Sequence, residues 1–266
     1  MTLLGTVAIA RLPINVRVNR WLKVRQPQGT VIYRQQGRSR PVRQGDRLQA
    51  VGDSVTTGKS STAMLEVDTG IGFIQLAEST KVTVRSLGVA PDNGRITRLA
   101  IDYGQARLQV RRFTHEGSRL ELQTPAGVSA VRGTEYGIAV QPDGKTGLAT
   151  LEGAVTMTAQ GKTVMVSGGL QTLTIPGQQP QPPVPLQDST ALRYDLERQV
   201  QNGIRRVRFI GYVDPVNTVL VNGVPQTTTA TGQFSVSLPA VSSPTLQVTV
   251  ITPLGRQQVH SLSLRL

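Results

Sequence analysis

The chain has 266 residues, of which 38% are hydrophobic and 4% aromatic, and its 29 lysines and arginines against 16 acidic residues give a net charge of +13. It contains no cysteine and two histidines, His115 and His260, so disulfides and thiolate metal sites are excluded. A two-histidine zinc site or a Ser-His-Asp triad is poorly supplied, and we expect neither a cofactor nor enzyme activity.

The first segment, residues 1–23, contains the short apolar stretch MTLLGTVAIARL, with an Ala-Ile-Ala that resembles a cleavage site. It lacks the positive start of a signal peptide, so a truncated export signal and a first β-strand both remain open. No run of 18 apolar residues occurs, and we expect no transmembrane segment.

Positive charge is concentrated near the start of the chain. Residues 11–47 hold one acid, Asp46, and ten basic residues: Arg11, Arg17, Arg20, Lys23, Arg25, Arg34, Arg38, Arg40, Arg43 and Arg47. Such a cluster attracts nucleic acid, acidic glycan, lipid head groups or an acidic protein, but it is also typical of a solvated arginine-rich β surface. We take Arg34, Arg38, Arg40, Arg43 and Arg47 as the candidate anion-contacting residues.

Residues 24–176 form a series of short alternating segments separated by turn signals, which predicts a sandwich, roll or solenoid of strands. LKVRQPQGTVIYR predicts a hairpin that turns at residues 27–29, and LAIDYGQARLQVRR predicts two strands. Ala63, Leu65 and Val67 fall on one face. A meander follows, with turns at 142–144, 152–153, 160–161 and 168–169.

The Gly-Asp pairs at 45–46 and 52–53 predict tight turns in which the aspartate caps nearby amides. Asp46, Asp53, Glu66, Asp68 and Glu78 could pair in space as a glycosidase requires, but capping is the simpler role for the first two.

A proline-rich linker is expected at 177–187, followed by an amphipathic helix at 188–204. Leu192, Leu196, Val200 and Ile204 make its apolar stripe, and Asn202-Gly203 suits a helix end. Short alternating strands with an Asn-Gly hairpin turn then predict a small sandwich over 208–266.

The stretch GVSAVRGTEYGIAV, residues 127–140, reads as a strand interrupted by an arginine and by glycines. If Arg132 points inward, it needs a carboxylate partner, and Glu135 and Glu152 are the nearest candidates. Gly133 would permit a bulge that re-aims Arg132. A partner contact is the alternative role.

The order of GDRLQAVGDSVTTGKSSTAMLEV, LAESTKVTVRSL, IDYGQARLQV, LQTPAGVSAVRGTEYGIAV and GLATLEGAVTM resembles the FecR domain. The most specific piece comprises Thr124-Pro125 and the motif Arg132, Gly133, Thr134 and Glu135 with Val131 before it. The C-terminal part resembles bacterial immunoglobulin-like modules through GYVDP-x-N, VNG and G-x-F-x-V. The fold expected is therefore all-β, a FecR-like antiparallel β roll or sandwich plus a short linker helix and a small Ig-like β-sandwich.

The resemblance implies an exported domain of the cell envelope, since FecR domains are known as the periplasmic part of inner-membrane regulators that relay a signal to a sigma factor. We expect a non-catalytic periplasmic or extracellular adaptor that binds an envelope protein or an acidic glycan. One alternative is a soluble periplasmic signalling relay. A basic nucleic-acid-binding β protein is the other, and the absence of a nucleic-acid-binding module disfavours it.

Overall fold

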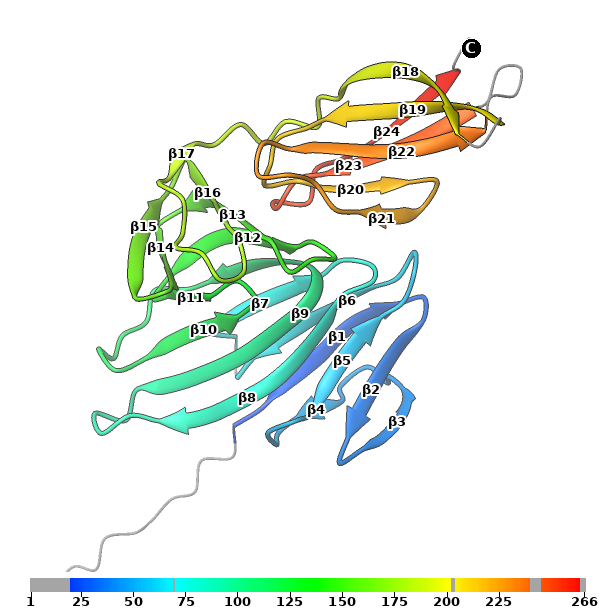
Figure 1. The fold of residues 1–266 in the computed structure, drawn as a ribbon. Coiled ribbons are helices and arrows are strands. Elements are labelled where there is room, and N and C mark those ends of the chain that lie inside the picture. Colours follow the sequence, from blue (N-terminus) through cyan, green and yellow to red (C-terminus); the bar gives the residue numbers. More distant parts are fainter. Residues whose placement is uncertain (1–19, 69, 202–203, 240–244, 264–266) are drawn as a thin grey trace, which may run out of the picture.

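The computed structural model describes residues 20–68, 70–201, 204–239 and 245–263. Within these ranges the protein contains strands and turns and no helix (Figure 1). An N-terminal unit holds seventeen strands: β1 (Leu22–Gln28), β2 (Val31–Gln35), β3 (Arg38–Pro41), β4 (Arg47–Leu48), β5 (Ser54–Thr57), β6 (Thr62–Val67), β7 (Gly72–Leu76), β8 (Lys81–Val89), β9 (Arg95–Val110), β10 (Arg119–Gln123), β11 (Val128–Val131), β12 (Thr134–Val140), β13 (Thr146–Glu152), β14 (Ala154–Ala159), β15 (Lys162–Ser167), β16 (Leu170–Thr174) and β17 (Val184–Pro185).

Two layers make up this unit, and β9 belongs to both. The first layer has the order β4-β1-β6-β7-β9-β12-β13-β16-β17. The second has the order β3-β2-β5-β8-β9-β10-β11-β14-β15. All pairings are antiparallel except β9 with β10. The sequence predicted two strands where β9 runs, but this is one strand that passes between layers at Gly104, where φ is +95°.

The turns between strands serve two purposes that sequence cannot separate. Some close hairpins, as between β14 and β15, whereas others carry the chain from one layer to the other. The hairpin predicted around residues 27–29 is wrong for this reason: β1 pairs in the first layer and β2 in the second. The same holds for the turn at 152–153, which leads from β13 to β14.

The core lies between the layers, where alternate residues of each strand point inward. The face predicted from Ala63, Leu65 and Val67 is confirmed, since all three are at most 4% exposed. Leu108, Tyr136 and Ile138 are fully buried in the same cluster. Truncating a buried leucine to alanine in such a core costs about 2–5 kcal/mol.

The C-terminal unit is a seven-stranded sandwich. It contains β18 (Arg193–Gln201), β19 (Ile204–Tyr212), β20 (Thr218–Val221), β21 (Val224–Gln226), β22 (Gln233–Pro239), β23 (Thr245–Ile251) and β24 (Gln257–Ser263). One sheet has the order β18-β19-β22 and the other β21-β20-β23-β24. Phe209, Phe234 and Val248 are buried between them. The Asn222-Gly223 hairpin is confirmed between β20 and β21.

The predicted helix at 188–204 is wrong, because its segment forms β18, which pairs along its whole length with β19. A spacing of four residues is even, so Leu192 and Leu196 share one face of a strand just as they would share one face of a helix. Tyr194 lies on that face too and stacks on Phe209 at a centroid distance of 5.3 Å. The expected helix end at Asn202-Gly203 lies outside the described residues.

The proline-rich segment lies against the first layer. Gln181 N donates to Leu173 O, Leu186 N donates to Gly169 O, and β17 pairs with β16. This segment therefore covers the outer edge of β16. The export-signal expectation for residues 1–23 falls mostly on residues 1–19, outside the described part, and β1 begins at Leu22.

Candidate functional site

The Val131-Arg132-Gly133-Thr134-Glu135 motif marks a passage between the two layers. β11 ends at Val131 in the second layer and β12 begins at Thr134 in the first. Gly133 has φ +136°, and a Cβ there would lie 2.5 Å from Arg112 Cα. Glycine is therefore required, because any side chain would meet the neighbouring backbone in a conformation that L-residues rarely adopt.

Arg132 is exposed, and the expected buried ion pair is wrong for this residue. Its Nη2 donates to His115 O at 3.4 Å, and within the part of the chain that the structure describes it forms no ion pair. Glu135 pairs instead with Arg107, whose Nη2 lies 2.5 Å from Oε1. The register irregularity of β12 lies between Glu135 and Tyr136 rather than at Gly133.

Among the arginines that the structure describes, the buried one is Arg20, which the sequence analysis placed in the basic cluster. Its guanidinium donates to both oxygens of Asp68, at 3.3 and 2.9 Å, and the two side chains are 3% and 5% exposed. It also donates to Thr97 Oγ1 and to the carbonyls of Gly88 and Ile96. These contacts satisfy its donors and tie the start of the domain to β8 and β9.

The candidate anion-contacting arginines are exposed, but they do not form one surface. Cross-strand register places Arg38 and Arg40 with Tyr33 on one face of the β2–β3 hairpin, and Arg34 on the other. Arg47 lies over the Trp21 ring, at 4.4 Å from the centroid. Arg43, also exposed, follows β3.

Arg40 is held in place by its neighbours. It lies 4.8 Å from the centroid of the Tyr33 ring and pairs with Asp46 at 2.7 Å. The Arg40 hydrogen bond, aided by the Arg43 amide, lowers the pKa of Asp46 below its ordinary value. Two of the five candidate arginines, Arg40 and Arg47, are thus already engaged within the chain.

The capping role expected for the turn aspartates is confirmed. Asp46 Oδ2 accepts the Arg43 amide at 2.7 Å, and Asp53 Oδ2 accepts the amides of Gln49 and Ala50 at 2.9 and 3.0 Å. Glu66 pairs with Arg25 at 2.8 Å. In the described ranges, no three acidic or histidine side chains gather as a metal site.

A junction between the two units brings together residues that sequence reasoning missed. Three buried glutamines of the N-terminal unit, Gln105, Gln141 and Gln171, bond to loops of the C-terminal sandwich. Gln105 Nε2 donates to Thr252 O at 2.6 Å, and Gln171 Nε2 donates to an Asp214 carboxylate oxygen at 2.7 Å.

Gln141 makes the most complete of these junction contacts. Its Nε2 donates to Asn217 O at 2.9 Å, and its Oε1 accepts the Thr228 amide at 3.2 Å. Lys145, 4% exposed, donates to Thr228 O and to Asp143. Buried amides are costly unless bonded, so these contacts require the sandwich to sit on this face of the sheet.

Glycines let the sandwich loops approach the sheet closely. A Cβ on Gly137 would lie 1.9 Å from Pro253 O, and a Cβ on Gly147 would lie 2.2 Å from Val216 O. Gly137, the third glycine of the 127–140 stretch, therefore serves the junction. The glycines on these neighbouring strands are visible in the sequence and indicate a close approach by another segment. The sequence does not show that the approaching segment is a loop of the C-terminal sandwich.

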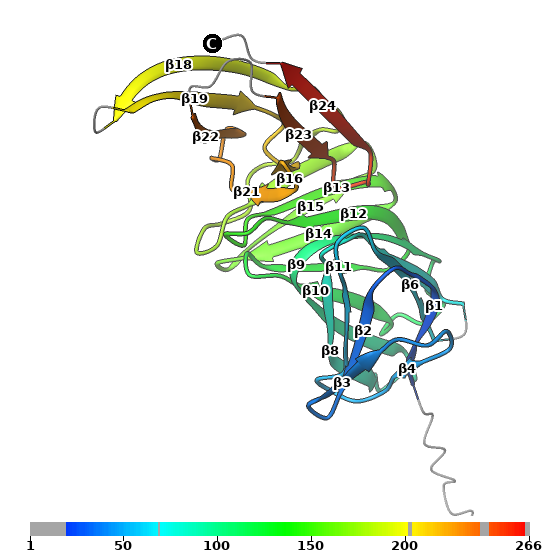
Figure 2. The same ribbon diagram turned by 90° about the vertical axis from the view of Figure 1, so that its right-hand side faces the viewer.

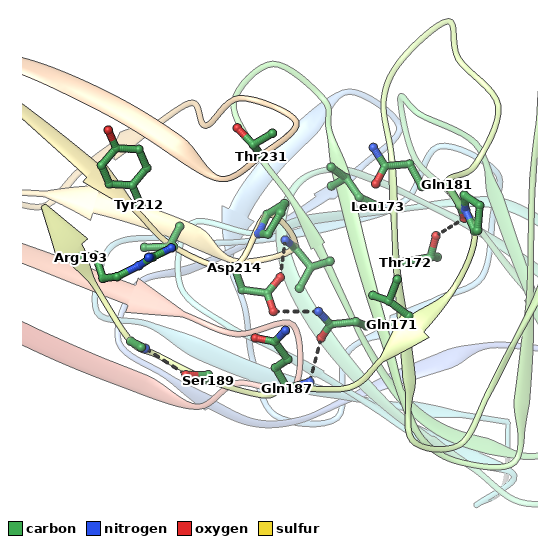
Figure 3. A pocket seen from close by; sticks show the side chains of 16 residues that line it. Gln171, Thr172, Leu173, Gln181, Gln187, Ser189, Arg193, Tyr212, Asp214 and Thr231 are labelled. Carbon is green, nitrogen blue, oxygen red and sulfur yellow. Dashed lines mark hydrogen bonds between the residues drawn. The ribbon is translucent and has the colours of Figure 1, made fainter.

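Two clefts are lined by residues of both units. Figures 1 and 2 show how the two units lie relative to each other. The first cleft, about 410 Å³, is lined by polar groups that include Gln187, Arg193 and Tyr212. Figure 3 shows Asp214 bonded to Gln171 at its base. Burial, followed by the nearby Asp195 charge, raises the pKa of Tyr212 above its ordinary value.

The second cleft, about 480 Å³, lies beside the β9 crossing and has more apolar walls. The N-terminal unit contributes Tyr103, Val140 and Pro142, and the sandwich contributes Leu220 and Pro225. Tyr103 is 42% exposed. Glu78 and Gln105 add polar groups at its wall.

Comparison with known proteins finds a family match for part of the N-terminal unit. The family model described as FecR protein matches residues 53–156, from the start of β5 into β14. Comparison with curated protein sequences finds no match. No helix of the described part is long and apolar enough to cross a membrane.

Two crystal structures of a candidate anti-sigma factor from Parabacteroides distasonis ATCC 8503 are similar in part. One has a TM-score of 0.40 and 16% identity over 47% of this chain and 56% of that chain. The other has a TM-score of 0.42 and 14% identity over 55% and 68%. The chain thus spans little more than half of the first of these proteins. The match to the FecR protein family model thus covers residues 53–156, a segment that includes the motif at the layer passage.

Proposed function

We propose that the protein is a non-catalytic binding protein of the cell envelope, and that it holds a protein partner in the apolar cleft between its two units. The FecR domain supports an envelope and regulatory setting. The periplasm or the cell exterior is the compartment that this setting favours. The two-sheet, seven-strand arrangement of the C-terminal sandwich supports an Ig-like identity for that unit.

The observation that carries the proposal is the second cleft. Binding sites are commonly concave, largely apolar and placed at domain interfaces, with a few polar groups that fix orientation. Here Tyr103 and Leu220 come from different units, and the junction glutamines hold those units in one arrangement. A partially exposed aromatic beside prolines is the kind of anchor that dominates protein interfaces.

A protein partner fits this cleft better than a sugar does. Its wall offers Tyr103, Val140, Leu220 and Ile251 but only Glu78 as a charged group. Sugar sites require many hydrogen-bonding groups for their hydroxyls, since each unpaired polar group costs free energy on burial. An extended segment with apolar side chains would place them against these residues.

Site-specific crosslinking tests the proposal. A photoreactive phenylalanine analogue at Tyr103 should crosslink one protein when envelope extract is added, and the same analogue at Val51, which is 71% exposed elsewhere, should not. Leu220→Glu should abolish the Tyr103 crosslink, because a carboxylate would then lie in the apolar wall. Equal labelling from the two positions would refute the cleft as the site.

Acidic glycan is a second candidate, favoured by Arg38 and Arg43, which are exposed and unpaired in the described part of the chain. A soluble signalling relay would use the protein-binding cleft and is compatible with the FecR match. Nucleic acid is disfavoured because two of the five candidate arginines are already engaged by Asp46 and Trp21.

A further inference from the structure

We propose that β15 is an interface for a second copy of this chain, through antiparallel pairing of β15 with β15. This inference is independent of the cleft. β15 ends the second layer, and its described backbone bonds within a sheet go to β14 alone. An open strand end of this kind is a template for another strand.

The turn before β15 fixes which backbone groups face outward. The β14–β15 hairpin has a two-residue loop, Gln160-Gly161, with φ +48° and +73°. Both values are positive, as in a type I′ turn, so Ala159 and Lys162 form a hydrogen-bonded pair. Alternation along the strand then leaves the N–H and C=O groups of Thr163, Met165 and Ser167 directed away from β14.

The other edges of the N-terminal unit are protected. In the first layer, the end strands β4 and β17 are each two residues long. In the second layer, β3 carries Arg38, Arg40 and a proline, which oppose pairing with a further strand. Among the described edges of this unit, β15 alone combines six residues with a neutral stretch, Thr-Val-Met-Val-Ser.

The face beside this edge is also free of charge, in a chain of net charge +13. Cross-strand register places Met165, Thr156 and Ala130 in one row, and Thr163, Thr158 and Val128 in the next. Met165 is 63% exposed and Val128 is 36% exposed. A charged partner strand would find no complementary charge here, whereas an identical neutral strand needs none.

The strand is self-complementary about Met165. A two-fold axis there pairs Met165 with Met165 of the second copy, Val164 with Val166, and Thr163 with Ser167. Lys162 then lies beyond the pairing, opposite Gly168, so no like charges meet. The same patch serves both copies, as a two-fold interface requires. A paired area of this size is small, so the dimer should be weak and concentration-dependent.

Sedimentation equilibrium across a dilution series tests the proposal. The wild-type mass should rise from 28.6 kDa toward twice that value as concentration increases. Met165→Lys, which would place two like charges opposite one another, should weaken dimerisation at least about tenfold. Val51→Lys, a matched charge change at a 71% exposed position elsewhere, should leave it unchanged. A wild-type chain that stays monomeric, or a Met165→Lys chain that dimerises normally, would overturn the proposal.

Two further variants separate backbone pairing from side-chain contact. Thr163→Pro removes an outward N–H and the exposed hydroxyl bond to Thr158, but no backbone bond to β14, so the fold should persist while dimerisation weakens. Met165→Cys adds the sole thiol of the chain, and oxidation by glutathione disulfide should join two copies through it. Val51→Cys, treated identically, should remain monomeric. If both cysteine variants crosslink equally, the contact is not at β15.

Discussion

Gly137 in β12 faces the carbonyl of Pro253 so closely that a Cβ on the glycine would lie 1.9 Å from the oxygen. The two residues are far apart in sequence, and their contact joins the N-terminal unit to the loop between β23 and β24. The sandwich therefore rests directly on the backbone of the sheet, beside the bonds that Gln105 makes to Thr252 and Pro253.

Gly137→Ala should displace the sandwich, because the added methyl group cannot coexist with the Pro253 carbonyl. The expected result is a larger radius of gyration in small-angle X-ray scattering, with the strand content by circular dichroism retained. Gly88→Ala is the matched control, since a Cβ there meets only Ser86 Oγ, at 3.7 Å. Identical scattering from the two variants would show that the junction is not packed as described.

Arg20 and Arg132 should respond differently to the same substitution. Arg20→Ala leaves the buried Asp68 with Arg95, at 3.6 Å, as its remaining basic neighbour in the described part of the chain, so the variant should lose on the order of 3 kcal/mol. Arg132→Ala removes an exposed side chain with one long bond to His115 O, and should change stability by less than about 0.5 kcal/mol. Urea melts of the two variants measure both values. A larger loss from Arg132→Ala would reverse their assigned roles.

Alkaline pH should destabilise the N-terminal unit through Tyr33. Burial, with Asp53 next, raises the pKa of Tyr33 to about 12 from its ordinary value of 10. The folded chain holds this proton more tightly, so its stabilising contribution is complete below pH 10 and is lost as pH rises through 12. Burial also raises the pKa of Tyr136, which adds to the same loss.

Tyr33→Phe isolates that contribution. It removes the bond to Arg47 O and should cost about 1 kcal/mol at pH 7, while making stability less dependent on pH between 10 and 12. Urea melts at a series of pH values give the slope. An unchanged slope in the variant would mean that Tyr33 does not carry the effect.

Arg38 and Arg43 should bind acidic glycan only at low salt. Alginate binding should fall steeply as the Debye length shortens from about 30 Å to about 8 Å. Arg38→Glu with Arg43→Glu should abolish it, and Arg111→Glu with Arg112→Glu, an equal charge change at exposed positions, should not. Loss of binding in both double variants would indicate net charge as the cause.

The sequence predicted most of the β architecture, because alternation records which side chains face the core. It failed at β18, where Leu196 and Leu192, just before the strand, are four residues apart, a spacing that a helix and a strand share. It also failed at turns, since a short turn such as that at 27–29 serves a hairpin or a layer passage equally well.

The residues of the candidate site were harder to predict from the sequence than the strands were. The need for a paired buried arginine was recognised, but the residue was Arg20 rather than Arg132, because nothing local distinguishes an inward guanidinium from an outward one. Gln141 and Gly147 contact loop residues of the C-terminal sandwich that lie about 70 positions further along the chain. Such contacts depend on how two units meet, which periodicity does not encode.

The most direct test of the central claim is affinity capture from envelope extract by four tagged variants in parallel, with the protein identified by the Tyr103 crosslink as the readout. Tyr103→Glu alters the cleft, Arg132→Glu the motif, Arg38→Glu the basic hairpin, and Val51→Glu an exposed apolar control. If the cleft holds the partner, Tyr103→Glu alone should lose it, and the other three should retain wild-type levels. Retention by Tyr103→Glu, with loss in Arg132→Glu, would contradict the account and move the binding site to the motif.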